Sequence, residues 1–320
     1  MIKNKKKLES VLFNVLAILL FTVGLVLSLY PTVSDVYGKY RDSKLIAKYE
    51  NDIGSMSKQE KIDYLAKAVD YNNKLYNKAN GFLVTKYQHK DIVEKSDPEE
   101  YETYENMLKN SSSRIMCTIS IPKIAVTLPV YHWSTDSVLE KGIGHIHGSS
   151  LPVGNGVDPE DPEFANIPGS HSLFIGHRGL PSLKLFSDLD EMEEGDMFYV
   201  KTLGKTYAYK IYDVETVLPT EVENLKIEPG KDLCTLITCT PYGVNTHRIL
   251  VKGERVPYDG ESIEADTLTM IKKTVDPKTV FGICFVIFII YLFVINKKPK
   301  KQKGNTGDQH DEEETSGNGS

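Results

Sequence analysis

The stretch from Leu233 to Val251 reads LCTLITCTPYGVNTHRILV and contains two apolar runs with a turn between them. Branched and apolar side chains dominate both runs, which is typical of β-strands. Pro241 and Gly243 interrupt the pattern, because proline cannot donate a ladder hydrogen bond and glycine permits a tight turn. We therefore expect the second run to return beside the first as its antiparallel neighbour.

Similar short runs recur between residues 114 and 258, separated by turns rich in glycine and proline. Such a series of short strands predicts a mainly β domain, either a barrel or a sandwich. The segment between Leu151 and His171 contains too much proline, glycine and aspartate for a regular element, so we expect a surface loop there. The predicted strands are Ile115–Ile121, His171–His177, Met197–Leu203, Thr206–Leu218, Leu233–Thr240 and His247–Val256.

The segment before this domain has a helical character. Between residues 42 and 76, apolar side chains recur at helical spacing, and Gly54 marks the expected break between two helices. The next segment, Lys90–Glu100, is charged, contains Pro98 and follows neither the helical nor the strand periodicity. Its composition predicts a connecting loop.

Two long apolar runs flank these segments. Val11–Tyr30 has about 20 residues, enough to cross a bilayer and longer than the apolar core of a cleaved signal peptide. Val280–Ile295 is slightly shorter, but the lysines that follow it can lengthen its effective span. Lysine clusters lie at the outer end of each run. We therefore expect a two-pass membrane protein with both termini in the cytoplasm and the middle of the chain outside.

Charge excludes one class of partner. The formal net charge is −6, and the dense basic clusters lie only beside the apolar runs, so we expect no nucleic-acid partner. The chain divides into a basic N-terminus (1–10), a transmembrane helix (11–30), a helical lead-in (31–113), a β domain (114–258), a linker (259–279), a second transmembrane helix (280–295) and a basic, then acidic, tail (296–320).

The chain contains four cysteines. Cys284 lies in the second apolar run, and the remaining three do not make a disulfide framework. Cys117 and Cys234 lie within predicted strands, where a buried core position is the usual fate of a lone cysteine. Cys239 ends its strand directly before the turn, so its thiol is expected at an edge of the sheet. A buried core position is the commoner fate of a cysteine in such a run, and that alternative stays open for Cys239, the candidate nucleophile.

Basic side chains flank this thiol. His247 and Arg248 begin the returning strand, but successive side chains face opposite ways, so only one of them shares a face with Cys239. The unknown register of the turn leaves that choice open. A cation on that face would lower the thiol pKa or bind a developing oxyanion. His177 also ends a predicted strand before a turn, and a Cys–His pair at neighbouring strand ends is the minimum for acyl transfer from a peptide carbonyl.

No metal or cofactor is expected. His145 and His147 have a spacing that suits two metal ligands, but no cysteine or carboxylate cluster accompanies them. The sequence also lacks the G-x-G-x-x-G, P-loop and H-E-x-x-H patterns. Nucleotide and zinc chemistry therefore have no support in the sequence.

The segment Thr238–Arg248 resembles the active-site signature of the sortases. Gly176–Pro181 resembles the catalytic-histidine segment of that family, and Ile121–Ile124, Leu128–His132 and Ser149–Gly154 resemble its other recurring segments. Two membrane runs that enclose the domain, with a helical lead-in, resemble the pilus-assembling class C sortases more than the single-anchor housekeeping enzymes.

This resemblance implies an eight-stranded closed β-barrel with Cys239 as nucleophile, His177 as general acid and base, and Arg248 as the cation that orients substrate and stabilises the oxyanion. It implies a secreted pilin or surface protein as substrate, cleaved at a C-terminal LPXTG-like sorting signal through a thioester. In class C enzymes a pilin lysine then resolves the thioester, and the enzyme acts at the Gram-positive cell surface.

Two other functions would fit parts of this sequence. A sortase that attaches surface proteins to cell-wall peptide would use the same chemistry with another amine. A non-enzymatic surface protein, with the second apolar run as its own sorting signal, would need an LPXTG-like motif upstream, and Thr274–Thr279 does not supply one.

The resemblance also implies a lid over the active site. Class C lids carry Asp-Pro followed by an aromatic residue. Here Asp97 and Pro98 are followed by Glu99, and Tyr101 is the nearest aromatic residue. Asp97, Pro98 and Tyr101 are therefore the candidate lid residues.

Overall fold

This computed structural model describes residues 2–79, 98–109, 114–154, 168–180, 183–219, 221, 225–258 and 260, with 282, 285, 286 and 289. The chain forms two compact units, Met1–Thr274 and Val275–Ser320. The four described residues of the second unit are helical. The rest of the predicted second membrane run, all but one residue of the linker and the whole tail lie outside the described residues.

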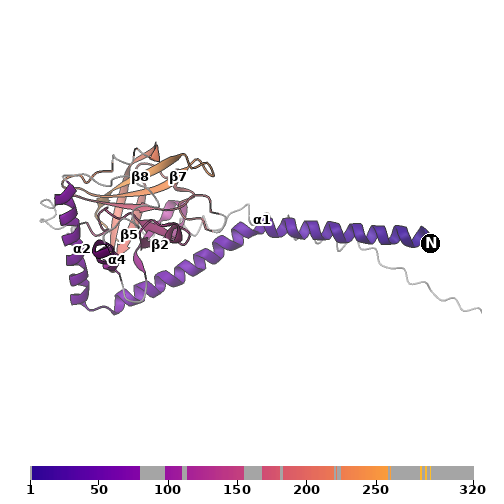
Figure 1. Cartoon of the computed structure of the whole chain (residues 1–320), viewed down its shortest axis with the longest axis horizontal. Coiled ribbons are helices and arrows are strands. Elements are labelled where there is room, and N and C mark those ends of the chain that lie inside the picture. The colour runs from indigo at the N-terminus through magenta and orange to yellow at the C-terminus, as the bar shows by residue number, and fades with distance from the viewer. Residues whose placement is uncertain are drawn as a thin grey trace, which may run out of the picture. The chain divides into compact units, whose positions relative to one another are not determined.

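Eight strands close into a barrel in the order β1-β2-β3-β4-β7-β8-β6-β5 (Figure 1). Neighbouring strands are antiparallel except for two parallel pairs, β2 with β3 and β4 with β7. The closed barrel agrees with the sortase resemblance and excludes the sandwich. The strands are β1 (Ile115–Ile121), β2 (Val126–His132), β3 (Ile143–His145), β4 (Ser170–Ile175), β5 (Met197–Thr202), β6 (Lys205–Val217), β7 (Asp232–Thr240) and β8 (His247–Val256).

The strand pattern missed β2 and β3. Pro129 lies inside β2, and proline in a run argues against a strand on sequence grounds. β3 has only three residues, too few for alternation to be visible. The predicted strand His171–His177 was also too long, because β4 ends at Ile175 and leaves His177 in the following turn.

Two long helices precede the barrel. α1 (Ile2–Ser55) and α2 (Lys58–Ala79) are separated at Met56 and Ser57, which confirms the break expected near Gly54. The Ser57 side chain accepts a hydrogen bond from the Glu60 backbone N–H, and the Glu60 carboxylate accepts one from the Ser57 N–H. This reciprocal pair is a capping box, which satisfies two backbone donors at the start of α2.

α1 also contains the first predicted membrane run. Among the described residues, one helix is long and apolar enough to cross a membrane, over the span Leu19–Ser55, and its most apolar window is unburied. The helix continues through Pro31 without a break. The membrane run and the start of the predicted lead-in are therefore one helix.

The second half of α1 packs against the barrel. The Tyr49 hydroxyl donates to the Met116 carbonyl at 3.0 Å, and Tyr49 is fully buried with Ile53 and Ile115. Lys201 of β5 forms an ion pair with Glu50 at 2.6 Å. This half of α1 is thus part of the folded domain.

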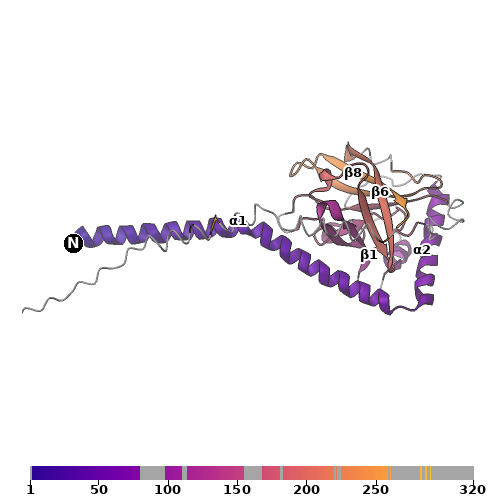
Figure 2. The same ribbon diagram turned by 180° about the vertical axis from the view of Figure 1, so that it is seen from behind.

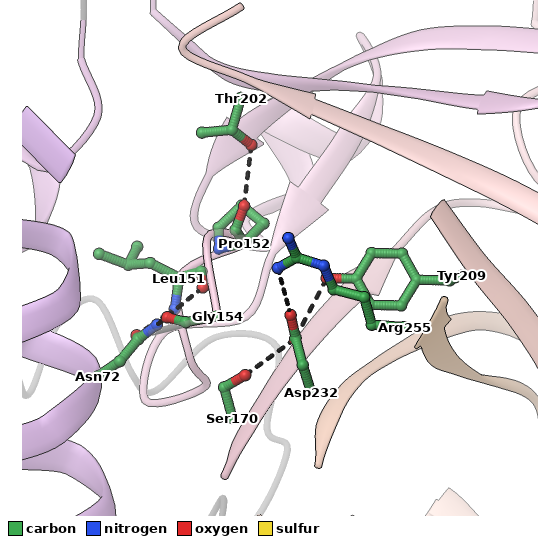
Figure 3. Close-up of polar contacts among 9 residues, drawn as sticks. All are labelled: Asn72, Leu151, Pro152, Gly154, Ser170, Thr202, Tyr209, Asp232 and Arg255. Atoms are coloured by element: carbon green, nitrogen blue, oxygen red, sulfur yellow. Dashed lines mark hydrogen bonds and ion pairs between the residues drawn. The ribbon is translucent and has the colours of Figure 1, made fainter. Parts of the chain in front are cut away.

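The end of α2 docks on the segment that follows β3. Asn72 of α2 is fully buried and donates hydrogen bonds to the carbonyls of Leu151 and Gly154, while its side-chain oxygen accepts one from the Leu151 N–H at 2.7 Å. Figure 3 shows these contacts, and α2 lies beside the barrel in both views (Figures 1 and 2). Asn72 replaces the water that these backbone groups would otherwise need.

A buried ion pair lies at the start of β7, close to the Asn72 contacts (Figure 3). Asp232 accepts hydrogen bonds from Arg255 at 2.8 Å, Ser170 at 2.9 Å and Tyr209 at 3.3 Å. The side chains of Arg255 and Asp232 are 3% and 1% exposed. Gly154 has a φ of +53°, and a Cβ there would lie 2.6 Å from an Asp232 carboxylate oxygen. This network joins β4, β6, β7 and β8.

The core divides between the two faces of the sheet. Cys234 and Leu236 of β7 belong to the main cluster, which draws on every strand of the barrel and fills its interior. Ile237 belongs to a second cluster, with Ile175 of β4 and Leu250 of β8. Because side chains alternate along a strand, this second cluster lies on the outer face of β4, β7 and β8. We call this surface the outer face.

Candidate active site

The register between β7 and β8 decides which cation accompanies Cys239. Cys239 is paired directly with Arg248, and Thr240 with His247. Directly paired residues in an antiparallel ladder share a face, so Arg248 lies on the same face as Cys239 and His247 lies on the other. This is the outer face, because Cys239 and Ile237 are two residues apart. The choice that spacing left open is therefore Arg248.

The parallel pairing of β4 with β7 brings His177 to the same place. Ile175 is paired with Ile237, and the Gly176 N–H donates to the Ile237 carbonyl at 3.1 Å. The Thr238 hydroxyl then donates to the Gly176 carbonyl at 2.8 Å. His177 and Cys239 each follow one residue after these contacts, so the two segments lead into the same end of the barrel. All three predicted site residues thus lie at one end of the barrel.

The three cysteines of the barrel differ in exposure. Cys117 and Cys234 are fully buried, and desolvation raises the pKa of both thiols because burial disfavours the thiolate. Cys239 is partly exposed. Among the described cysteines, Cys239 is therefore the thiol that a substrate can reach, and no disulfide joins the three.

Burial acts on His177 as well. Desolvation lowers the pKa of its imidazole, because burial disfavours the charged form, and the carboxylates of Asp136 and Glu140 act in the opposite direction. Asp136 begins the short helix α5 (Asp136–Leu139), and Glu140 directly follows it. An imidazole with a lowered pKa is neutral at neutral pH and is ready to accept a proton.

The two arginines near Cys239 differ in their partners. Arg248 donates from Nη1 to the carbonyls of Asn245 and His247, each at 3.0 Å, and within the described residues it forms no ion pair. Its buried Nε has no hydrogen-bond partner there. Arg178 instead forms an ion pair with Asp190 at 2.5 Å. Arg248 is therefore the cation whose charge remains available to a developing oxyanion.

His247, His145 and His147 make other contacts. His247 interacts through Nδ1 with the Thr246 hydroxyl at 2.9 Å. His145 is fully buried, its Nδ1 is 2.6 Å from the Tyr104 hydroxyl, and the His147 ring packs on Tyr104 and Trp133. In the described ranges no group of three histidine, cysteine or carboxylate side chains is arranged to hold a metal ion. The His145–His147 spacing reflects aromatic packing.

The predicted connector Lys90–Glu100 is wrong at its end, because the helix α4 (Pro98–Asn106) begins there. Proline suits the first position of a helix, where its missing N–H is not needed. Of the candidate lid residues, Pro98 and Tyr101 belong to α4, and Asp97 lies outside the described residues.

Sequence reasoning missed two residues with structural contacts. Tyr104 anchors α4, fully buried against His132 and Trp133. Arg178 reaches the Thr240 hydroxyl, which neither strand pattern suggests. The only sequence signal for this contact was position, because Arg178 directly follows His177 and Thr240 directly follows Cys239.

Comparison with known proteins identifies the family. A sortase-domain profile matches residues 119–256. The crystal structure of sortase C1 from Streptococcus agalactiae superimposes with a TM-score of 0.57 and 39% identity, covering 68% of this chain and 100% of that one. Sortase C of Streptococcus pneumoniae gives a TM-score of 0.54 and 34% identity over 67% and 97% of the two chains.

A curated relative gives a shorter match. Sortase A of Streptococcus agalactiae is 30% identical over 158 residues, which is 49% of this chain and 59% of that protein. The full-length structural matches are to sortase C enzymes, which agrees with the class C resemblance. With its closed barrel and a partly exposed cysteine at a strand end, the chain belongs to the sortase family of cysteine transpeptidases.

Proposed function

We propose that this chain cleaves LPXTG-like sorting signals through a thioester on Cys239 and joins pilin subunits through a lysine amine. The observation that carries the proposal is the pairing of Cys239 with Arg248, with His177 two residues beyond Ile175, the last residue of β4 paired with β7. This arrangement supports Cys239 as nucleophile, His177 as proton carrier and Arg248, which pairs with no carboxylate among the described residues, as the cation.

In the first step, the Cys239 thiol passes its proton to the neutral His177 imidazole as sulfur attacks the substrate carbonyl carbon. Negative charge develops on the carbonyl oxygen, and the Arg248 guanidinium is the group that balances it. The bond from the carbonyl carbon to the amide nitrogen then breaks, and His177 returns the proton to the leaving amine. A thioester remains on Cys239.

In the second step, an incoming amine attacks the thioester carbonyl carbon. Its proton moves to His177 as the nitrogen–carbon bond forms, and it reaches the departing sulfur as the carbon–sulfur bond breaks. Water competes with the amine at this stage. Limited access of water to the site therefore favours transfer over hydrolysis.

The identity of the amine separates two sortase functions. A pilin lysine is supported by the sortase C matches, and the structure of the Streptococcus pneumoniae enzyme is described as giving insight into pilin substrate specificity. Attachment of surface proteins to cell-wall peptide is the second candidate, because the curated relatives include Sortase A enzymes. Membership of the sortase family argues against a non-enzymatic surface protein.

We place the catalytic domain outside the cell membrane, held by α1 and by the run Val280–Ile295 as a second membrane helix, with both termini cytoplasmic. The apolar first part of α1 and the lysines flanking both runs support this topology. A protease added to cells stripped of wall should digest the domain and spare an epitope placed after Lys303. Digestion of that epitope would contradict the two-pass arrangement.

The segment around Asp97, Pro98 and Tyr101 is proposed as the lid. Asp97 would contact Arg248 when the lid is closed, and the rigid ring of Pro98 would hold the turn that delivers it. The double variant Asp97→Ala, Pro98→Ala should then react a few-fold faster at Cys239 with a bulky thiol reagent. Unchanged rates would show that the segment does not cover the thiol.

An amine competition tests the main proposal. The full chain in detergent is incubated with an LPXTG peptide, a lysine peptide with a blocked α-amine, and a glycine peptide, and the products are identified by mass spectrometry. We expect a product joined through the lysine ε-amine and no turnover by Cys239→Ala. A product joined only to glycine would favour wall anchoring, and turnover by Cys239→Ala would reject Cys239 as nucleophile.

A further inference from the structure

A second arginine links the two segments that carry the proposed nucleophile and base. Arg178 follows His177, and its Nη1 donates to the hydroxyl of Thr240, which follows Cys239, at 3.1 Å. Its Nη2 pairs with Asp190 at 2.5 Å. The Arg178 side chain is only 11% exposed, and its contact with Thr240 is partly buried, whereas Asp190 is 46% exposed and lies at the surface. One guanidinium therefore connects the residues adjacent to both reacting groups.

The contact between Arg178 and Thr240 lies where it can set the distance between the His177 and Cys239 segments. The ladder between β4 and β7 ends near Gly176 and Thr238. Beyond that point, regular strand pairing no longer sets the distance between the two backbones. The contact from Arg178 to Thr240 spans the two chains one residue past His177 and Cys239, where the ladder has stopped.

A second contact joins the same two segments. The Tyr242 hydroxyl donates to the Gly179 carbonyl at 3.3 Å. The tyrosine ring also covers Gly179 closely, since a Cβ on Gly179 would lie 2.7 Å from a ring carbon. The Gly179 N–H in turn donates to the Ser187 hydroxyl at 3.1 Å. The turn after His177 is thus held on both sides.

Asp190 defines the role of the arginine. It lies in the 3-10 helix η3 (Leu189–Glu191), which the barrel core anchors through the fully buried Leu189. By pairing with one end of the planar guanidinium, Asp190 orients the other end toward Thr240 and balances its charge. A lysine has no such fork and cannot make both contacts in the same geometry.

We propose that Arg178, oriented by Asp190, is a positioning residue that holds the His177 and Cys239 segments at reaction distance through the Thr240 hydroxyl. The inference rests on the proposed roles of Cys239 and His177 and adds to them a residue that touches neither substrate nor thiol. Its loss should change the alignment of the pair and leave substrate binding in place.

The test compares Arg178→Ala, Thr240→Val and the double variant in cleavage of an LPXTG peptide by the full chain. Each single variant should lower kcat by about ten- to a hundredfold with little change in KM, since small misplacements of reacting groups have effects of this size. The double variant should be no worse than the more affected single variant, because both changes remove the same contact. Arg178→Lys should recover only part of the rate.

Lys252→Ala is the matched control. Lys252 is 13% exposed and pairs with Asp213 and Glu215, so it resembles Arg178 in burial and pairing. It lies four residues beyond Arg248 on β8, about 13 Å along the strand. This variant should keep the parental kcat. A thermal unfolding curve of each variant verifies that it is folded, and the near-isosteric Thr240→Val carries the test if Arg178→Ala does not fold.

A second readout separates positioning from general stability. The pH profile for alkylation of Cys239 by a small thiol reagent should move in Arg178→Ala toward the profile of His177→Ala, while Lys252→Ala keeps the parental profile. Parental kcat in both single variants, or losses that add fully in the double variant, would overturn the inference. Turnover by Cys239→Ala would instead reject the proposed function itself, so the two failures are distinguishable.

Discussion

Two neighbouring residues of β8 face opposite ways, and the proposed function gives a catalytic role to only one of them. Arg248 is paired with Cys239, and His247 is paired with Thr240. A strand alternates its side chains, so a shift of one residue in this register would exchange them. The proposal of Arg248 as the catalytic cation therefore depends on the register between β7 and β8.

This pairing predicts unequal effects of two alanine substitutions. Arg248→Ala should lower kcat for peptide cleavage by about a hundred- to a thousandfold, the usual effect of removing one group that stabilises an oxyanion. His247→Ala should stay within a few-fold of the parent, because its side chain faces away from the thiol. Steady-state kinetics with an LPXTG peptide measure both. Equal losses would mean that the face has been wrongly assigned.

Among the elements, β7 has a buried ion pair at one end and a partly exposed thiol near the other. Asp232 begins the strand with a fully hydrogen-bonded buried ion pair, and Cys239 stands near its end with a partly exposed thiol. Seven residues, or about 23 Å of strand, separate them. The Asp232 end links four strands of the barrel, while the Cys239 end is accessible to a substrate.

Removing Asp232 should therefore destabilise the fold without altering the chemistry. Asp232→Ala leaves Arg255 buried without its carboxylate, at a cost of about 3 to 5 kcal/mol in the free energy of unfolding. Urea denaturation measures the loss. Lys123→Ala is the control, because its pairs with Glu193 and Asp196 are partly exposed and should contribute less than about 1 kcal/mol. Similar losses in the two variants would contradict the buried pair's role.

The elements also show what a sequence can and cannot predict. Long patterned segments such as β6 and the break between α1 and α2 were correctly predicted, because periodicity and capping residues are local. β2, β3 and α4 were missed, since Pro129, a three-residue length and a short charged stretch leave little local signal. The positions of Cys239, His177 and Arg248 were recognisable from a family resemblance. Their mutual register, and the contact of Arg178 with Thr240, depend on pairings between distant strands.

At the scale of the whole molecule, buried histidines should make the fold sensitive to acid. Burial lowers the pKa of His145 to about 3 and that of His171 to about 4, so both are neutral when folded. In the unfolded chain they bind a proton near pH 6.5. Between the folded and unfolded pKa values, the unfolded state binds more protons than the folded state. The stability that the two neutral histidines contribute is therefore full above about pH 6.5 and is lost as the pH falls toward their folded pKa values.

The same linkage gives the expected loss in the free energy of unfolding. Each histidine should remove about 2 kcal/mol from the free energy of unfolding between pH 7 and pH 5. Denaturant titrations across this range measure the slope. His171→Gln should flatten it, because glutamine can still hydrogen-bond to the Lys226 carbonyl and Thr235 but does not titrate. A parental slope that is already flat would show that these imidazoles are not desolvated in solution.

The continuous helix α1 sets how far from the bilayer the enzyme works. The Lys184 N–H, in the loop that follows His177, donates to Asp35 at 3.3 Å, only five residues after the apolar run ends at Tyr30. At the rise of an α-helix, this is about 8 Å of spacer. A stiff spacer of this length samples little volume, unlike a flexible linker. With the apolar run in the membrane as proposed, this spacer would hold the loop after His177 at a low, fixed height. That height would suit substrates whose cleavage site emerges only a few residues above their own membrane segment.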